Sequence, residues 1–139
     1  MSILNVDRDV SYFVGGFGSG LDHPECITSG LEGNAYAGGE SGQIYKIDTN
    51  DRTFLEIANT KNFVGGIAQS GDGDLYVCSG SVMKVTQSGE LSVYSDGNEI
   101  DKIASPNYPA FDKFGNLFVS DSGVWRENNG RIFKILPGG

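Results

Sequence analysis

Cysteine and histidine are scarce in this sequence, and their scarcity excludes several kinds of site. The 139 residues include two cysteines, Cys26 and Cys78, and one histidine, His23. Two cysteines this far apart form neither a disulfide framework nor a Cys-x-x-Cys zinc site. Both fall in or beside apolar strand patterns, so we expect buried free thiols. A serine–histidine or cysteine–histidine nucleophile would depend on His23 alone, and no Gly-x-Ser-x-Gly elbow accompanies it.

Basic residues are few, and long apolar runs are missing. Lys and Arg total 10 against 18 Asp and Glu, which gives a formal charge of −8 and a pI near 4.4. The basic residues are scattered singly, which argues against a phosphate-backbone binder, so we expect no nucleic-acid partner. Residues 1–13 have neither a basic n-region nor an uninterrupted apolar run. We therefore expect no secretory signal, no membrane span and, by default, a cytoplasmic location.

What the sequence does have is glycine and a repeat. Glycine accounts for 21 residues, which suits short strands joined by tight turns. Three similar segments align on Gly33, Gly73 and Gly115, at intervals of 40 and 42 residues. Each reads as a strand, a glycine turn and a second strand, and a strand-built repeat of about 40 residues is typical of a β-propeller blade. We therefore predict an all-β fold of about three four-stranded propeller blades.

The blades are expected at residues 22–60, 61–96 and 104–139, in one partial propeller domain that spans residues 1–139. The predicted strands are Glu25–Ser29, Asn34–Gly38, Gln43–Asp48, Thr53–Ala58, Gly66–Gln69, Asp74–Cys78, Ser81–Thr86, Leu91–Ser95, Tyr108–Asp112, Asn116–Ser120 and Arg131–Leu136. Blade three contains an insertion at 124–130 and only three strands, so we expect half of a ring with an open sheet edge. Residues 10–20 begin like a strand and are a candidate to complete a blade from the other end.

Several glycine and acidic clusters are interpreted as turns. The glycines at 16, 18 and 20 match half of a dinucleotide fingerprint, but no helical period follows them. Asp72 and Asp74 lack the spacing of a calcium-binding loop, which favours a hairpin turn. Asp121 and Ser122 follow a predicted strand, where capping of a turn is the default role.

The repeat segments also carry a family resemblance. PECI at 24–27, GGIA at 65–68 and PNYPAFDKFGNLFVSDSG at 106–123, followed by GRIFKI at 130–135, resemble the senescence-marker-protein / gluconolactonase / luciferin-regenerating-enzyme family. The squid phosphotriesterase that hydrolyses organophosphates is a relative. The resemblance covers residues 12–139, about the N-terminal half of a family member. Strictosidine-synthase-like and other six-bladed propellers share the general pattern and remain alternatives.

The resemblance implies a six-bladed propeller with a divalent metal, often calcium, in its central channel. Its ligands are a Glu in the first blade, an Asn in the third, and an Asn and an Asp further on. Glu25 and Asn107 match the first two, and the others would lie beyond residue 139. Tyr108 stands where many relatives have an Asp, and His23 is expected in a loop near the channel mouth. Both are weak candidates for substrate contact. The family's substrates are lactones and phosphoesters.

Elementary chemistry is compatible with such a site. Hard divalent cations take several oxygen ligands, including carboxylates and amide carbonyls. Residues at equivalent strand starts ring a propeller channel, so Glu25 and Asn107 can point toward one axis. A cation there would polarise a substrate carbonyl and lower the pKa of bound water. Two side chains leave most coordination positions to water, which predicts half a metal site of weak affinity.

The sequence thus predicts a metal-dependent lactonase or esterase-like hydrolase acting on a small lactone or ester, with no catalytic base identifiable. This chain is expected to be a truncated, inactive piece, or else a half-propeller that closes a six-bladed ring as a homodimer. A dimer would direct two copies each of Glu25 and Asn107 to one cation. A third reading, a non-enzymatic interaction module, stays open because fold does not give function.

Overall fold

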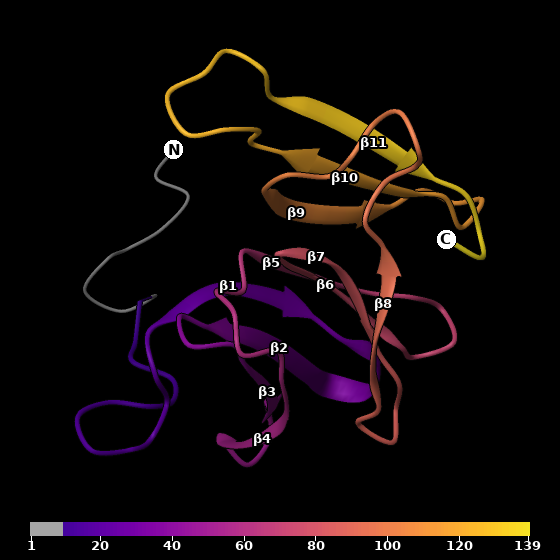
Figure 1. The fold of residues 1–139 in the computed structure, drawn as a ribbon. Helices are drawn as coiled ribbons and strands as arrows, with labels where there is room; N and C mark the ends of the chain where they lie inside the picture. The colour runs from indigo at the N-terminus through magenta and orange to yellow at the C-terminus, as the bar shows by residue number, and fades with distance from the viewer. Residues whose placement is uncertain (1–9) are drawn as a thin grey trace, which may run out of the picture.

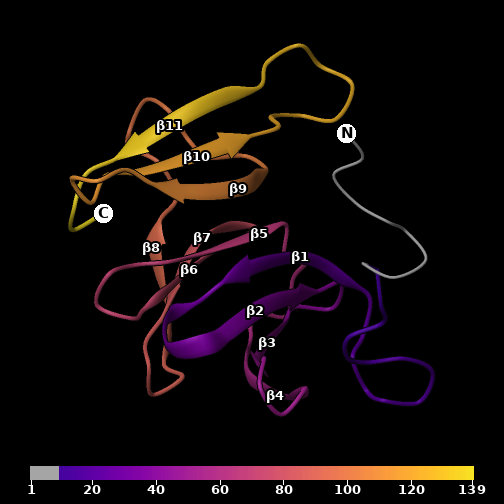
Figure 2. The same cartoon turned by 180° about the vertical axis from the view of Figure 1, so that it is seen from behind.

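The computed structural model describes residues 10–139, which form three antiparallel sheets stacked one on the next (Figures 1 and 2). Blade one, residues 22–60, has the strands β1 (Pro24–Ser29), β2 (Asn34–Gly39), β3 (Gln43–Asp48) and β4 (Thr53–Asn59), with a short 3₁₀ turn, Leu31–Gly33, before β2. Blade two, residues 61–96, has β5 (Gly66–Gln69), β6 (Leu75–Ser79), β7 (Ser81–Val85) and β8 (Leu91–Ser95). Blade three, residues 104–139, has β9 (Pro106–Phe111), β10 (Leu117–Asp121) and β11 (Arg131–Ile135).

This architecture confirms the predicted partial β-propeller. Each predicted strand is present, with its ends within two residues of the expected positions. The strands follow one another in order across each sheet, and blade three has three strands in the described chain. Among residues 10–139, no helix is long and apolar enough to cross a membrane. The expectation that the N-terminus contains neither a secretory signal nor a membrane span falls largely on residues 1–9, which lie outside the described residues.

The repeat glycines turn the chain between the first two strands of each blade. Gly33, Gly73 and Gly115 have φ of 74°, 96° and 81°, a left-handed conformation that favours glycine. The Gly73 amide donates to the Ser70 carbonyl at 3.0 Å, and the Gly115 amide donates to the Asp112 carbonyl at 3.2 Å. Glycine therefore recurs every 40 or so residues because the same turn recurs.

The sheets pack through an aromatic residue that recurs in the second strand of each blade. Tyr36 is 7% exposed in the core between blades one and two, and Tyr76 is 8% exposed in the core between blades two and three. Phe118 is the equivalent residue of blade three. It is 37% exposed, because the described chain has no following blade to cover it.

The expectation of a strand within residues 10–20 is wrong. Residues 10–20 contain no strand, and Gly15, Gly16, Gly18 and Gly20 all have positive φ, outside the β region of ordinary strands. The segment instead packs on the outer face of blade one. Its Val14 and the following Leu21 join a cluster of the buried residues Ala35, Ala37, Tyr45 and Ile47.

Candidate functional site

The first strands of the three blades, β1, β5 and β9, lie side by side at the inner edge of the stack (Figure 1). Strand pairing aligns Cys26 with Gly38, Gly66 with Cys78 and Tyr108 with Ser120. The preceding residues, Glu25, Gly65 and Asn107, therefore occupy one equivalent position in successive blades. This is the position at which the sequence predicts metal ligands.

Glu25 and Asn107 are both bulged residues. In blade one the ladder pairs Pro24 with Gly39 and then Cys26 with Gly38, so Glu25 has no partner. In blade three it pairs Pro106 with Asp121 and then Tyr108 with Ser120, so Asn107 is passed over in the same way. A bulge takes a residue out of the ladder and re-aims its side chain. Both residues are exposed.

Gly65 explains why the middle blade offers no side chain at this position. Its amide donates to the Cys78 carbonyl at 2.9 Å within blade two, and β5 lies directly against β9 of blade three. A Cβ on Gly65 would lie 2.7 Å from the Asn107 carbonyl oxygen, and a Cβ on Gly66 would be equally close. Such contacts are too short for any real Cβ, so the approach of β5 to β9 requires glycine.

Asn107 is held from one side. Its Nδ2 donates to the Ser122 hydroxyl at 3.3 Å, and no hydrogen bond of the described residues engages its Oδ1. Ser122, which the sequence indicated only as a turn residue, therefore orients the amide. Asn107 and Ser122 line a shallow hollow of about 400 Å³ together with Ile132 on β11.

Asp121 lines the same hollow but is committed to the fold. Its Oδ1 accepts from the amides of Ser105 at 2.7 Å and Gly123 at 3.0 Å, and its Oδ2 accepts from Ala104 at 3.0 Å. Burial opposes its charge, and the three amides more than compensate, so the pKa of Asp121 falls below its usual range. The predicted capping role is confirmed, and the carboxylate has little capacity left for a ligand.

The weaker site predictions fall at two places. Tyr108 follows Asn107, and its ring lies beside Gly66, whose added Cβ would be 2.8 Å from the Tyr108 Cδ2. His23 is exposed in the loop before β1, where its Nδ1 lies 2.7 Å from Asp22 Oδ1 and 3.7 Å from Glu40 Oε2. The hydrogen bond to Asp22, with the charges of Asp22 and Glu40, raises the pKa of His23. Blade one therefore has acidic groups near its strand start.

The donors present fit part of a calcium site. Glu25 offers a carboxylate and Asn107 an amide oxygen, both of the hard type that calcium prefers. Within residues 10–139, no three His, Cys, Asp or Glu side chains gather closely enough to hold a metal. The two bulged residues have suitable chemistry and are too few to complete a coordination shell.

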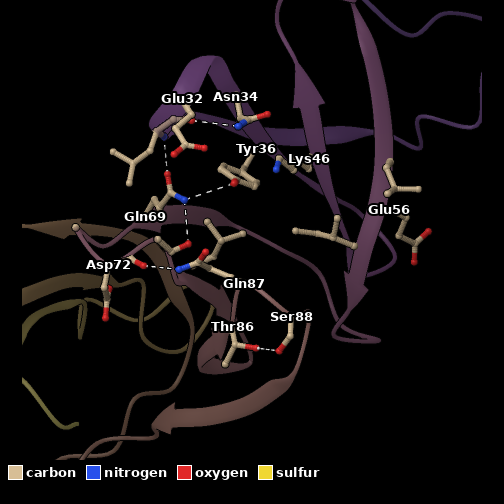
Figure 3. A pocket seen from close by; sticks show the side chains of 17 residues that line it. Glu32, Asn34, Tyr36, Lys46, Glu56, Gln69, Asp72, Thr86, Gln87 and Ser88 are labelled. Carbon is tan, nitrogen blue, oxygen red and sulfur yellow. Dashed lines mark hydrogen bonds between the residues drawn. The ribbon is translucent and has the colours of Figure 1, made fainter.

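A polar cleft of about 510 Å³ between blades one and two was not predicted (Figure 3). Gln69 spans it: its Oε1 accepts from the Leu31 amide at 2.7 Å, and its Nε2 donates to the Gly73 carbonyl at 2.9 Å and the Tyr36 hydroxyl at 3.4 Å. Gln87 Nε2 donates to the Asp72 carbonyl at 2.6 Å. Gln69 therefore links blade two to Leu31 and Tyr36 of blade one, whereas the Gln87 hydrogen bond lies within blade two. Buried polar side-chain atoms of the described chain all have protein partners. Single glutamines carry no sequence signal that would reveal such a link.

Comparisons with known proteins support the fold. No protein-family model matches the chain. No curated protein matches its sequence. Among solved structures, the chain is similar to a gluconolactonase from Xanthomonas campestris, with a TM-score of 0.68 and 12% identity over 86% of this chain and 47% of that one.

Two further solved structures show the same likeness. A streptogramin B lyase matches with a TM-score of 0.57 and 16% identity over 87% of this chain and 43% of the lyase. The extracellular domain of a putative hybrid two-component system from B. thetaiotaomicron matches with a TM-score of 0.59 and 22% identity over 84% of this chain and 15% of that one. The chain therefore has a gluconolactonase-like β-propeller fold and spans less than half the length of these proteins.

Proposed function

We propose that this chain supplies half of the metal-binding end of a propeller hydrolase that acts on small lactones or esters. The observation that carries the proposal is the shared bulge position of Glu25 and Asn107 on β1 and β9. The bulges re-aim two oxygen-bearing side chains at one equivalent position of the inner strands, which is compatible with a shared site on the propeller axis. The likeness to a gluconolactonase supports the reaction class.

Each of the chain's own site residues would have a separate role. A divalent cation, when bound, supplies polarisation of a substrate carbonyl and activation of water. Glu25 contributes the negative charge that attracts the cation, and Asn107 contributes a neutral oxygen. Ser122 fixes the Asn107 amide through Nδ2, so that Oδ1 stays available. Tyr108, next to Asn107, would contact the substrate from blade three, and His23 from the loop before β1.

Terbium, a luminescent substitute for calcium, provides the test. Tyr108 adjoins the proposed ligand Asn107, so a bound ion should be excited through tyrosine. We expect luminescence that calcium displaces and that falls by about tenfold or more in Glu25→Gln and Asn107→Leu, because each removes one of few ligands. The matched control is Glu90→Gln, which makes the same charge change at an exposed residue in the turn before β8.

Hydrolysis of glucono-δ-lactone with and without calcium tests the reaction class. Terbium binding that is equal in Glu25→Gln and Glu90→Gln would overturn the metal site. The alternative function, a non-enzymatic interaction module, is favoured by the exposed apolar residues of blade three. It predicts indifference to calcium and no lactone hydrolysis.

A further inference from the structure

Blade three has an exposed sheet face, whereas the equivalent faces of blades one and two are buried against the next blade. Strand pairing aligns Phe118 with Ala110 on β9 and Lys134 on β11, and Ser120 with Ile132. These side chains share the outer face of the sheet, where Ile132 is 71% exposed. The residues equivalent to Phe118 in the other two blades are Tyr36 and Tyr76. Tyr36 inserts between blades one and two, and Tyr76 packs edge-on against Phe111 of blade three at 5.0 Å between ring centroids. The repeat therefore builds Phe118 to enter another blade.

The receiving face in each junction comes from the second strand of the next blade. Leu75 and Val77 of blade two pack toward blade one, and Leu117 and Val119 of blade three pack toward blade two. Their equivalents in blade one are Ala35 and Ala37, on the face that no other blade covers. Within the described chain, blade one thus holds the remaining receiving face.

Small residues leave room on that face. A mainly apolar groove of about 540 Å³ runs along it, and its lining includes Ala35, Ala37 and Ile47. Val14 and Leu21 of the N-terminal segment form one wall without filling the space. Ala35 and Ala37 are smaller than the leucine and valine at the equivalent positions of the other blades, so the groove has room for a bulky side chain.

The two blades that carry these faces, blade one and blade three, have formal charges of opposite sign. Residues 22–60 contain seven acidic and two basic residues, a formal charge of −5, whereas residues 104–139 contain three acidic and four basic ones, a charge of +1. Lys134 lies on the outer face of blade three beside Phe118. Opposite charges favour contact between blades one and three and oppose contact between two copies of blade one.

We propose that a second copy of this chain docks its blade three face, centred on Phe118 and Ile132, into the blade one groove, and that a two-fold axis makes the contact twice. Two chains would then close one ring of six blades. The consequence for the metal site rests on the proposed function: the ring brings two Glu25 and two Asn107 to one end of the channel.

Sedimentation velocity of the full chain over a range of concentrations tests the proposal. We expect a dimer whose dissociation constant rises with salt and rises by about tenfold or more in Phe118→Asp. Ile132→Asp, on the same face and more exposed, should weaken the dimer in the same direction. The control is Val93→Asp, an equally drastic change at an exposed residue of β8. Circular dichroism checks that each variant is folded.

The outcomes separate this inference from the proposed function. A monomer at all concentrations, or a dimer that folded Phe118→Asp and Ile132→Asp leave unchanged, overturns the docking surface. A dimer sensitive to both variants but indifferent to terbium upholds the docking surface and contradicts the metal site. Terbium binding by a chain that stays monomeric, if it is weakened in Glu25→Gln and Asn107→Leu, upholds the two ligands and overturns the ring.

Discussion

Tyr76 of blade two meets Phe111 of blade three edge to face, with ring centroids 5.0 Å apart and an interplanar angle of 87°. Tyr94 also packs edge-on against Tyr76, with ring centroids 4.7 Å apart. One aromatic side chain therefore ties the second strand of its own blade to the first strand of the next. The same repeat position carries Tyr36 and Phe118, which allows a matched comparison.

Replacing Tyr76 with Ala should lower the free energy of unfolding by about 3–5 kcal/mol, because a large aromatic side chain leaves a cavity in the core. Urea unfolding in dilute solution measures the loss. Phe118→Ala makes a similar truncation at an exposed position and should cost under about 1 kcal/mol there. Equal losses in the two variants would contradict the assigned roles.

Gly66→Ala tests the close approach of blades two and three. The new Cβ would lie 2.7 Å from the Asn107 carbonyl oxygen and 2.8 Å from the Pro109 Cδ. We expect a loss of about 1–3 kcal/mol in the free energy of unfolding, since β5 and β9 must separate. Gly71→Ala, where nothing lies within 4 Å of the added Cβ, should change it by less than about 0.5 kcal/mol.

Asp121 should make stability depend on pH. Its folded-state pKa is lowered, with three amide donors outweighing burial, so its stabilisation is complete above the unfolded value of about 3.9 and is lost as the pH falls through the folded pKa. Asp121→Asn should cost about 1–3 kcal/mol at pH 7. The difference in free energy of unfolding between Asp121→Asn and the parent chain, measured by urea unfolding, should become smaller below about pH 4. A difference in free energy of unfolding that stays constant with pH would contradict this role.

Cys78 should be inert in the folded chain. Burial, with smaller effects of Cys26 and Asp121, raises the pKa of its thiol to about 12, so at pH 8 the reactive thiolate is on the order of one part in ten thousand. Cys26 is only partly buried, although burial raises its pKa as well. Ellman's reagent should detect at most one slow thiol in native protein and two in urea. Two fast native thiols would refute the burial of Cys78.

Local patterns in the sequence were sufficient to predict the strands. Alternating side chains and the turn glycines, Gly33, Gly73 and Gly115, are short-range signals, and the 40-residue spacing put equivalent strands in register. Glu25 and Asn107 could be matched for the same reason. The bulges that free them from the ladder depend on pairing with the second strand of each blade, which the sequence alone does not specify.

Features that depend on distant contacts could not be predicted. Residues 10–20 begin like a strand in sequence, but their glycines turn the chain, and the position of the segment depends on contacts of Val14 and Leu21 with buried residues of blade one. The link made by Gln69 joins residues 38 positions apart in the chain. Neither arrangement has a periodic signal.

The central claim, that Glu25 and Asn107 share one divalent cation, is tested most directly by native mass spectrometry of the chain with and without calcium. We predict a mass increase of one calcium ion for each pair of chains, lost in Glu25→Gln and retained in Glu90→Gln. A chain that takes up no calcium in any oligomeric state, or takes it up equally in both variants, would contradict the claim.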